Sequence, residues 1–175
     1  MPPSETGPRG GSTRATPVPL LVVAALLLVA RIASGLLQPV ERPPRADLVH
    51  WREPGNAAES EARRAGKPIL YDFSAEWCGP CRTMQDEVFS DTRMAGKINA
   101  VYVPVRVLDR QREEGRNPAA VDTLQRMYRV QNFPTLVVTS PDGTRWQTLE
   151  GYRGSLATTQ WLSLAPLQVM GVMDH

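Results

Sequence analysis

Cysteine is scarce in this chain, with two in 175 residues. Two cysteines are too few for a disulfide-rich scaffold, and they cannot supply an intrachain four-cysteine zinc or iron–sulfur site. Histidine is equally rare, and His50 and His175 are isolated in the sequence, so we assign them no role. A single cysteine pair remains, and its neighbours decide what chemistry it can perform.

The chain also lacks a large excess of charge of either sign. Its formal net charge is +2, and Arg9, Arg14 and Arg31 against Glu5 account for all of it. The other residues sum to zero, and the arginines among them form no basic stripe. Because phosphate binding needs a clustered positive field, we expect no nucleic-acid partner. Hydrophobic residues make up 42% and charged residues 22%, which predicts one packed domain with a tail.

Two segments of different character open the chain. Residues 1–16 are rich in Pro, Gly, Ser and Thr, which predicts a disordered N-terminal tail. Residues 17–37 contain one charged side chain, Arg31, and a helix of this length would span about 31 Å, close to the thickness of a bilayer. We expect an uncleaved transmembrane anchor. A cleaved signal peptide, suggested by the uncharged run 18–30, and a buried core helix are the alternatives.

A proline-rich stretch over 38–47 separates this segment from the rest. With Pro39, Pro43 and Pro44, ten residues near polyproline geometry make a semi-rigid spacer of about 30 Å. Arginines flank both sides of the apolar segment and do not favour one orientation, but long C-terminal domains translocate largely regardless of charge. We therefore expect a membrane-anchored domain outside the cytoplasm, on the periplasmic side, or a secreted periplasmic domain if the segment is cleaved.

Beyond residue 48 the sequence alternates between strand and helix patterns. Strands separated by helices, then a hairpin and a last helix, predict an α/β domain over 48–165. Its mixed central sheet would be flanked by helices and preceded by the N-terminal hydrophobic helix. The polar stretch 109–118 is predicted as a loop and 166–175 as a C-terminal tail. The predicted helices are 57–65, with Asn56 as N-cap and Gly66 as stop, 78–89, 92–98, 119–128 and 155–164, and the predicted strands are 68–74, 100–108, 135–139 and 145–149.

The two cysteines lie in the sequence Trp77-Cys78-Gly79-Pro80-Cys81, after a predicted strand and at the start of a predicted helix. At this spacing the first sulfur would lie at the tip of the helix and the second one turn further in, near enough to form a disulfide. The thiolate is the nucleophile, so a reactive Cys78 requires a lowered pKa, which a helix N-terminus favours. An inert disulfide, or half of a zinc site shared with a second chain, is the alternative, and neither explains the Trp and Gly-Pro neighbours.

Residues 69–82, Ile-Leu-Tyr-Asp-Phe-Ser-Ala-Glu-Trp-Cys-Gly-Pro-Cys-Arg, resemble the active-site strand and helix of thioredoxins. Phe133-Pro134-Thr135 is similar to the cis-proline loop of that family, and Gly151 to the glycine after its last hairpin. The resemblance covers about residues 48–165. The flanking residues 66–68 and 88–91 resemble more closely the C-terminal thioredoxin-like domain of DsbD thiol:disulfide interchange proteins and related membrane-tethered thioredoxins.

This resemblance implies roles for three residues. Cys78 would attack a substrate disulfide, and Cys81 would resolve the mixed disulfide. Asp72 matches the buried acid of the family, which would take the proton from Cys81. Burial raises the pKa of a carboxyl group, so an acid at this position can accept a proton near neutral pH. The alternative for Asp72 is an edge-strand residue that faces solvent.

The resemblance also implies a substrate-binding rim. Pro134 would follow a cis peptide bond and present the backbone of Phe133 to an extended substrate chain. Trp77, Gly79 and Pro80 would complete the rim. An ordinary trans Pro134, and a Trp77 that only packs over the site, are the alternatives.

The chain departs from the thioredoxin pattern in three places. Ser74 replaces the first tryptophan of the family, and Val105 aligns with its buried lysine, which leaves Arg106 as a candidate substitute. About ten extra residues lie between Asp109 and Tyr128. The first two departures concern proton transfer, and the third suggests a partner-specific loop.

The sequence therefore predicts a thiol:disulfide oxidoreductase that works mainly as a reductase, since Gly-Pro between the cysteines resembles the reducing members of the family. An oxidase or isomerase with the same dithiol, and an assembly or chaperone module, are the alternatives. We expect disulfide-bearing or dithiol protein substrates and an upstream thiol electron donor. The pair Cys78–Cys81 would carry the redox chemistry without a bound cofactor or metal.

Overall fold

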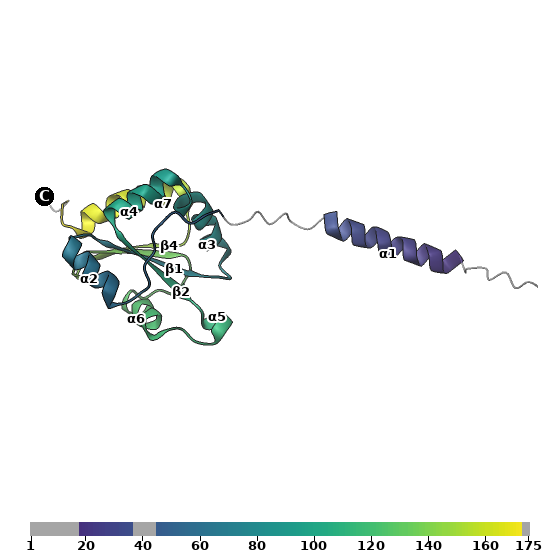
Figure 1. The fold of residues 1–175 in the computed structure, drawn as a ribbon, viewed down its shortest axis with the longest axis horizontal. Coiled ribbons are helices and arrows are strands. Elements are labelled where there is room, and N and C mark those ends of the chain that lie inside the picture. The colour runs from purple at the N-terminus through teal and green to yellow at the C-terminus, as the bar shows by residue number, and fades with distance from the viewer. Residues whose placement is uncertain (1–17, 37–44, 173–175) are drawn as a thin grey trace, which may run out of the picture. The chain divides into compact units, whose positions relative to one another are not determined.

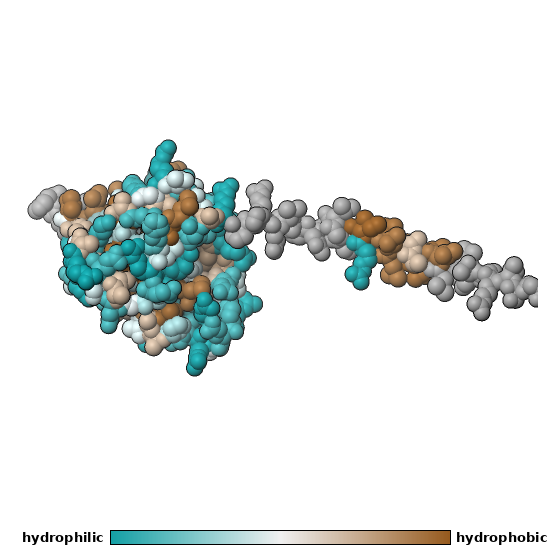
Figure 2. All heavy atoms as spheres, in the orientation of Figure 1, coloured by the Kyte–Doolittle hydropathy of each residue, from teal (hydrophilic) through white to brown (hydrophobic). Residues whose placement is uncertain are grey.

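The computed structural model describes residues 18–36 and 45–172 of the chain, which divides into two units, 1–42 and 43–175 (Figure 1). The first unit contains the helix α1 (Val18–Leu36), in agreement with the hydrophobic helix predicted there. The side chains of residues 21–32 are exposed and mostly apolar (Figure 2). Among the helices of the two described ranges, none combines the length and the hydropathy needed to cross a membrane. The tail predicted over 1–16 and most of the predicted spacer lie outside the described residues.

The second unit alternates helices with four strands. Helix α3 continues directly into a turn of π-helix, η1, so that together they form the helix predicted over 78–89. In chain order the elements are α2 (Asn56–Ala65), β1 (Ile69–Ala75), α3 (Gly79–Met84), η1 (Gln85–Phe89), α4 (Thr92–Val101), β2 (Val103–Asp109), α5 (Gln111–Glu114), α6 (Ala119–Met127), β3 (Thr135–Thr139), β4 (Trp146–Glu150) and α7 (Ser155–Val169).

The four strands form one mixed sheet in the order β2-β1-β3-β4. Strand β1 runs parallel to β2 and antiparallel to β3, which in turn is antiparallel to β4. All seven residues of β1 are buried because this strand has a neighbour on each side. In the parallel pair, Asp72 lies directly opposite Arg106. The mixed sheet with flanking helices predicted from the sequence is confirmed.

Helices cover both faces of the sheet, and each face has its own apolar core (Figure 1). On one face Leu70 and Leu136 pack against side chains from η1, α4 and α7. On the other face Phe73 and Val105 pack against α2, α6 and Tyr128. Because side chains alternate along a strand, Asp72 and Arg106 belong to the first face. This alternation places a carboxylate and a guanidinium inside a layer that is otherwise apolar.

The boundary between α4 and β2 differs from the prediction. The alternating valines predict a strand from residue 100, but α4 continues to Val101 and β2 begins at Val103. The amide of Tyr102 still donates to the carbonyl of Ile98 (2.9 Å), so an extra helical turn replaces the first residues of the predicted strand. The predicted loop 109–118 also contains a short helix, α5. At the start of α2, Gly55 and not Asn56 is the N-cap, whereas Gly66 ends the helix in a left-handed conformation as predicted.

The last helix is longer than predicted and passes through a proline. Helix α7 extends to Val169, although the sequence predicts its end near residue 164 and a tail from 166. Pro166 has no amide hydrogen to donate to the carbonyl of Leu162, one turn earlier. The buried hydroxyl of Tyr102 donates to that carbonyl instead, at 2.5 Å. A hydrogen bond from α4's C-terminal cap residue thus replaces the missing helical bond.

Candidate active site

The cysteine pair lies where β1 ends and α3 begins. Cys78 is the N-cap residue of α3, and its Sγ accepts a hydrogen bond from the amide of Cys81 (3.2 Å). Pro80 occupies the first turn of α3, where an amide hydrogen would have no acceptor within the helix, so proline costs no helical hydrogen bond there. An N-terminus that donates an amide hydrogen to Sγ favours a negative charge on that sulfur.

The two sulfurs are joined in this structure. Cys78 and Cys81 form a disulfide, with their Cα atoms 5.3 Å apart. Their residues are only 2% and 7% exposed, and they pack with Ala75 and Phe133. The local backbone therefore accommodates the oxidised state of the pair.

An exposed rim surrounds this nearly buried disulfide. The peptide bond between Phe133 and Pro134 is cis, as the sequence resemblance implies. Trp77 is 46% exposed and meets the ring of Phe133 edge to face, with the centroids 6.0 Å apart. Gly79 and Pro80 are also exposed. The structure thus gathers the residues of the predicted rim around the sulfurs, except that Pro134 itself is buried.

Asp72 is a buried acid, which excludes the solvent-facing alternative. It is 2% exposed in the middle of β1. Its Oδ2 accepts a hydrogen bond from Nε of Arg106 at 3.2 Å, whereas its Oδ1 has no hydrogen-bond partner. Burial raises the pKa of Asp72 to about 6, against the opposing effect of the Arg106 charge, while the negative charge of Asp47 raises it further. One carboxylate oxygen is therefore left to bind a proton near neutral pH.

A cavity of about 220 Å³ connects the buried acid with the second cysteine. Asp72 and Cys81 both line it, together with Ser74, Gln85 and Arg106. This volume is enough to admit water, and water can carry a proton between groups that do not touch. Ser74, which stands where thioredoxins have a tryptophan, helps to leave this space open.

The guanidinium of Arg106, and not residue 105, partners the buried acid. Val105 points to the opposite face of the sheet, where it is fully buried in the apolar core. Arg106 stands in register with Asp72 on the neighbouring strand. The same guanidinium also contacts Asp47 and Gln85. Sequence reasoning missed these two contacts, because residue 47 fell in the predicted spacer and residue 85 carries no charge.

The extra residues between Asp109 and Tyr128 fold against the rim. Asn117 and Gln125 donate hydrogen bonds to Asp109 Oδ2, at 2.7 and 2.8 Å, and so fix the path of the loop. The guanidinium of Arg112 lies over the ring of Trp77, 5.6 Å from its centroid. A cavity of about 370 Å³ separates this loop from Trp77 and Phe133. The insertion therefore forms one wall of a cavity whose other wall includes Trp77 and Phe133.

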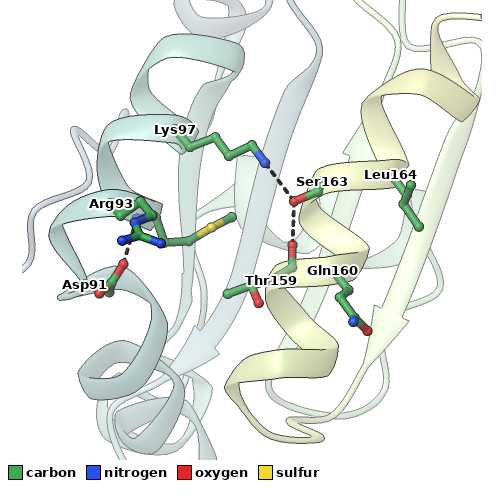
Figure 3. Close-up of a pocket in the computed structure, with 8 residues that line it drawn as sticks. Asp91, Arg93, Lys97, Thr159, Gln160, Ser163 and Leu164 are labelled. Carbon is green, nitrogen blue, oxygen red and sulfur yellow. Dashed lines mark hydrogen bonds between the residues drawn. The ribbon is translucent and has the colours of Figure 1, made fainter.

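Another cavity of the described residues lies apart from this site. A hollow of about 590 Å³ lies between α4 and α7, bridged by a hydrogen bond from Lys97 to Ser163 (Figure 3). None of the residues of the candidate active site lines it. Within residues 18–36 and 45–172, no three His, Cys, Asp or Glu side chains lie close enough to hold a metal ion.

Comparisons with known proteins agree with this geometry. Residues 55–165 match the family described as "Thioredoxin-like domain", and the chain belongs to this family. It is 34% identical over 94 residues to thiol:disulfide interchange protein DsbD 1 of Pseudomonas aeruginosa, which covers 54% of this chain and 15% of that protein. It is also 34% identical over 80 residues to a thioredoxin of Streptomyces clavuligerus, and that alignment covers 46% of this chain and 63% of the thioredoxin.

The fold is similar to that of a solved structure, the DsbH oxidoreductase. The TM-score is 0.58 at 23% identity, over 80% of this chain and 99% of that chain. The chain matches only part of the length of the two curated relatives. The thioredoxin-like relationship inferred from the sequence is confirmed.

Proposed function

We propose that this chain is a membrane-tethered thiol:disulfide oxidoreductase that mainly reduces protein disulfides. The observation that carries the proposal is the cavity lined by both Cys81 and Asp72, a buried acid whose Oδ1 has no hydrogen-bond partner. A structural disulfide has no use for a proton acceptor at this place. Relatives named as thioredoxin and thiol:disulfide interchange protein support the exchange of disulfides, and Gly79 and Pro80 between the cysteines support the reducing direction.

The reaction begins with Cys78 as a thiolate. A helix N-terminus stabilises such a charge by about 0.3–1 kcal/mol, and the amide of Cys81 adds a hydrogen bond to the sulfur. The thiolate attacks one sulfur of the substrate disulfide, which forms a mixed disulfide and releases the other substrate sulfur as a thiolate. That leaving thiolate takes a proton from solvent.

The second step releases the reduced substrate from Cys78. The Cys81 thiol gives its proton to the Asp72 carboxylate, through water in the shared cavity, and the resulting thiolate attacks Sγ of Cys78. The bond between Cys78 and the substrate breaks, the Cys78–Cys81 disulfide forms, and the second substrate sulfur leaves as a thiolate, which takes a proton from solvent as Asp72 returns its own proton to solvent. Two electrons have moved from the protein dithiol to the substrate, so an upstream dithiol must reduce the disulfide before the next cycle.

Insulin reduction tests this function directly. The full-length chain, supplied with dithiothreitol, is expected to accelerate the precipitation of reduced insulin B chain. The Cys78→Ala variant is expected to fall to the rate of dithiothreitol alone, because no nucleophile remains at the helix tip. Ser90→Ala serves as a control that leaves both cysteines in place. Equal rates for wild type and Cys78→Ala would favour an assembly or chaperone module, and faster oxidation of a reduced protein than reduction of insulin would favour an oxidase.

We also propose that residues 17–37 hold the domain at a membrane, on the side away from the cytoplasm. The support is that these residues carry one charge, Arg31, and that α1 presents an exposed, mostly apolar surface. The full-length chain is expected to stay with the membrane fraction after a carbonate wash, and a chain lacking residues 1–37 to be soluble. Protease added outside intact spheroplasts should digest the domain. Release of the full-length chain by carbonate, or a shortened soluble product, would contradict the anchor.

A further inference from the structure

The guanidinium of Arg106 has partners from several separate segments. Its Nε donates to Asp72 at 3.2 Å, its Nη1 to Asp47 Oδ2 at 2.5 Å, and its Nη2 to Gln85 Oε1 at 2.9 Å. Its central carbon also lies over the ring of Trp51, 4.3 Å from the centroid. One cation is thus shared by two carboxylates, and the shorter contact is to the one outside the core.

The segment that supplies Asp47 and Trp51 is itself held in place. Asp47 accepts hydrogen bonds from the indole of Trp51 (2.7 Å) and from the amide of Val49 (3.1 Å). Arg52 then pairs with β2: its amide donates to Pro104, and its carbonyl accepts from the amide of Arg106. The position of the Asp47 carboxylate is therefore defined by local hydrogen bonds and by the edge of the sheet.

We propose that Asp47 is a positioning residue that competes with Asp72 for the Arg106 guanidinium and so controls how readily Asp72 takes the proton of Cys81. This inference rests on the proposed function and deepens it. Asp47 does not line the cavity shared by Asp72 and Cys81, so it acts on the reaction through Arg106 and through its own charge.

Electrostatics gives the direction of the effect. Two carboxylates around one guanidinium leave a net negative charge, so Asp72 is incompletely compensated when it ionises. The other charged groups that line its cavity are Glu76, after β1, and Arg82, on α3. The Glu76 side chain is 59% exposed, against 29% for Arg106 and 27% for Asp47, so solvent screens its charge more than it screens theirs. Arg82 is also exposed and donates to the carbonyl of Glu76 rather than to Asp72.

Two substitutions are therefore expected to move the protonation of Asp72 in opposite directions. Asp47→Asn removes a negative charge and leaves Arg106 to Asp72, which favours the ionised carboxylate and lowers the pKa of Asp72. Arg106→Gln removes the cation that favours ionisation and raises the pKa of Asp72. A purely structural role of the segment does not predict opposite signs.

The experiment is a titration of the Asp72 carboxyl carbon by NMR. It uses the full-length chain in detergent micelles, labelled with ¹³C-aspartate, in the disulfide form so that neither cysteine titrates. Asp47→Asn is expected to move the midpoint about one pH unit lower, and Arg106→Gln to move it higher. Asp86→Asn is the matched control: Asp86 accepts a hydrogen bond from the amide of Arg45 (3.2 Å), near Asp47 in the sequence, but does not contact Arg106. Its midpoint is expected to stay at the wild-type value.

A double variant tests the route of the effect. If Asp47 acts mainly by holding Arg106, Asp47→Asn in the Arg106→Gln background is expected to shift the midpoint by less than half as much as in the wild type. An undiminished shift, no shift in the single variant, or an equal shift in Asp86→Asn would overturn the proposal. The titration does not require turnover, so a shifted midpoint in a chain that fails to reduce insulin would refute the proposed function and retain the link between Asp47 and Asp72.

Discussion

Replacing Cys81 with alanine is expected to arrest the reaction as a covalent complex, with a substrate cysteine attached to Cys78. The variant keeps the attacking sulfur at the helix tip but lacks the sulfur that releases the captured chain. Turnover of insulin should stop, and a band that disappears on reduction should form on a non-reducing gel. Mass spectrometry of the linked peptides then identifies Cys78 as the site of attachment.

The control for this experiment is the Cys78→Ala, Cys81→Ala double variant, which retains the rim but has no thiol. It is expected to capture nothing. Capture by Cys78→Ala, which keeps only Cys81, and not by Cys81→Ala would reverse the assignment of the two cysteines, since the residue inside the first turn would then be the nucleophile. The captured proteins would also identify substrates.

Replacing Asp72 with asparagine is expected to slow the resolving step about 100-fold at pH 7, because a general base of this kind contributes that much or more. The measurement is the single-turnover release of a substrate thiol after Cys78 has reacted. In the wild-type chain this rate is expected to rise with pH through about 6, as the Asp72 carboxyl ionises. Asp72→Asn should lose this rise, and a rate that keeps the wild-type profile would exclude Asp72 as the proton acceptor.

The same substitution is expected to stabilise the fold. The pKa of Asp72 is raised from 3.8 to about 6, so the folded state holds this proton more tightly than the unfolded chain does. The wild-type chain therefore loses stability as the pH rises from below 3.8 to above 6, by an amount of up to about 3 kcal/mol. Asparagine does not ionise, so Asp72→Asn should raise the free energy of unfolding by about 2 kcal/mol at pH 8, and by little below pH 4.

Asp109 offers a matched comparison for this stability experiment. It is also buried, at 8% exposed, but its carboxylate accepts hydrogen bonds from Gln111, Asn117 and Gln125. Asp109→Asn should therefore lower the free energy of unfolding at pH 8, because one accepting oxygen of the carboxylate becomes an NH₂ group that faces the neighbouring hydrogen-bond donors. Urea denaturation at both pH values checks the two variants, and a loss of stability in Asp72→Asn at pH 8 would contradict the account of its burial.

Local sequence signals predicted the elements that carry the cysteines, and they failed where distant residues decide the structure. The apolar run at 68–74 and the Cys78–Cys81 motif are adjacent in sequence, so their strand and helix could be placed to within a residue. By contrast, α7 continues through Pro166 because Tyr102, far away in the chain, donates to the freed carbonyl. A proline alone indicates the end of a helix, and no local pattern reveals such a donor.

The candidate site shows the same division. Asp72 and Pro134 could be named from the resemblance, but the partners of Asp72 could not. Arg106 was a candidate substitute for the buried lysine of thioredoxins, and the parallel register of β1 and β2 places it beside Asp72. Asp47 lies 59 residues from Arg106 in the chain, and in the sequence it is one more charged residue in a proline-rich stretch. The pairing of Arg52 with β2, together with the hydrogen bonds of Leu48 to Phe89 and Asn99, holds this stretch beside the active site.

The near burial of the two sulfurs limits which thiols can exchange electrons with the disulfide. Thiol exchange needs the incoming sulfur to approach along the axis of the bond it will break, and Cys78 and Cys81 leave little room for a free, low-mass thiol to do so. A protein that binds to Trp77 and Phe133 would place its own sulfur next to the disulfide. We therefore expect low-mass thiols such as dithiothreitol to reduce the oxidised domain more slowly, at equal concentration, than a protein dithiol that docks on this rim.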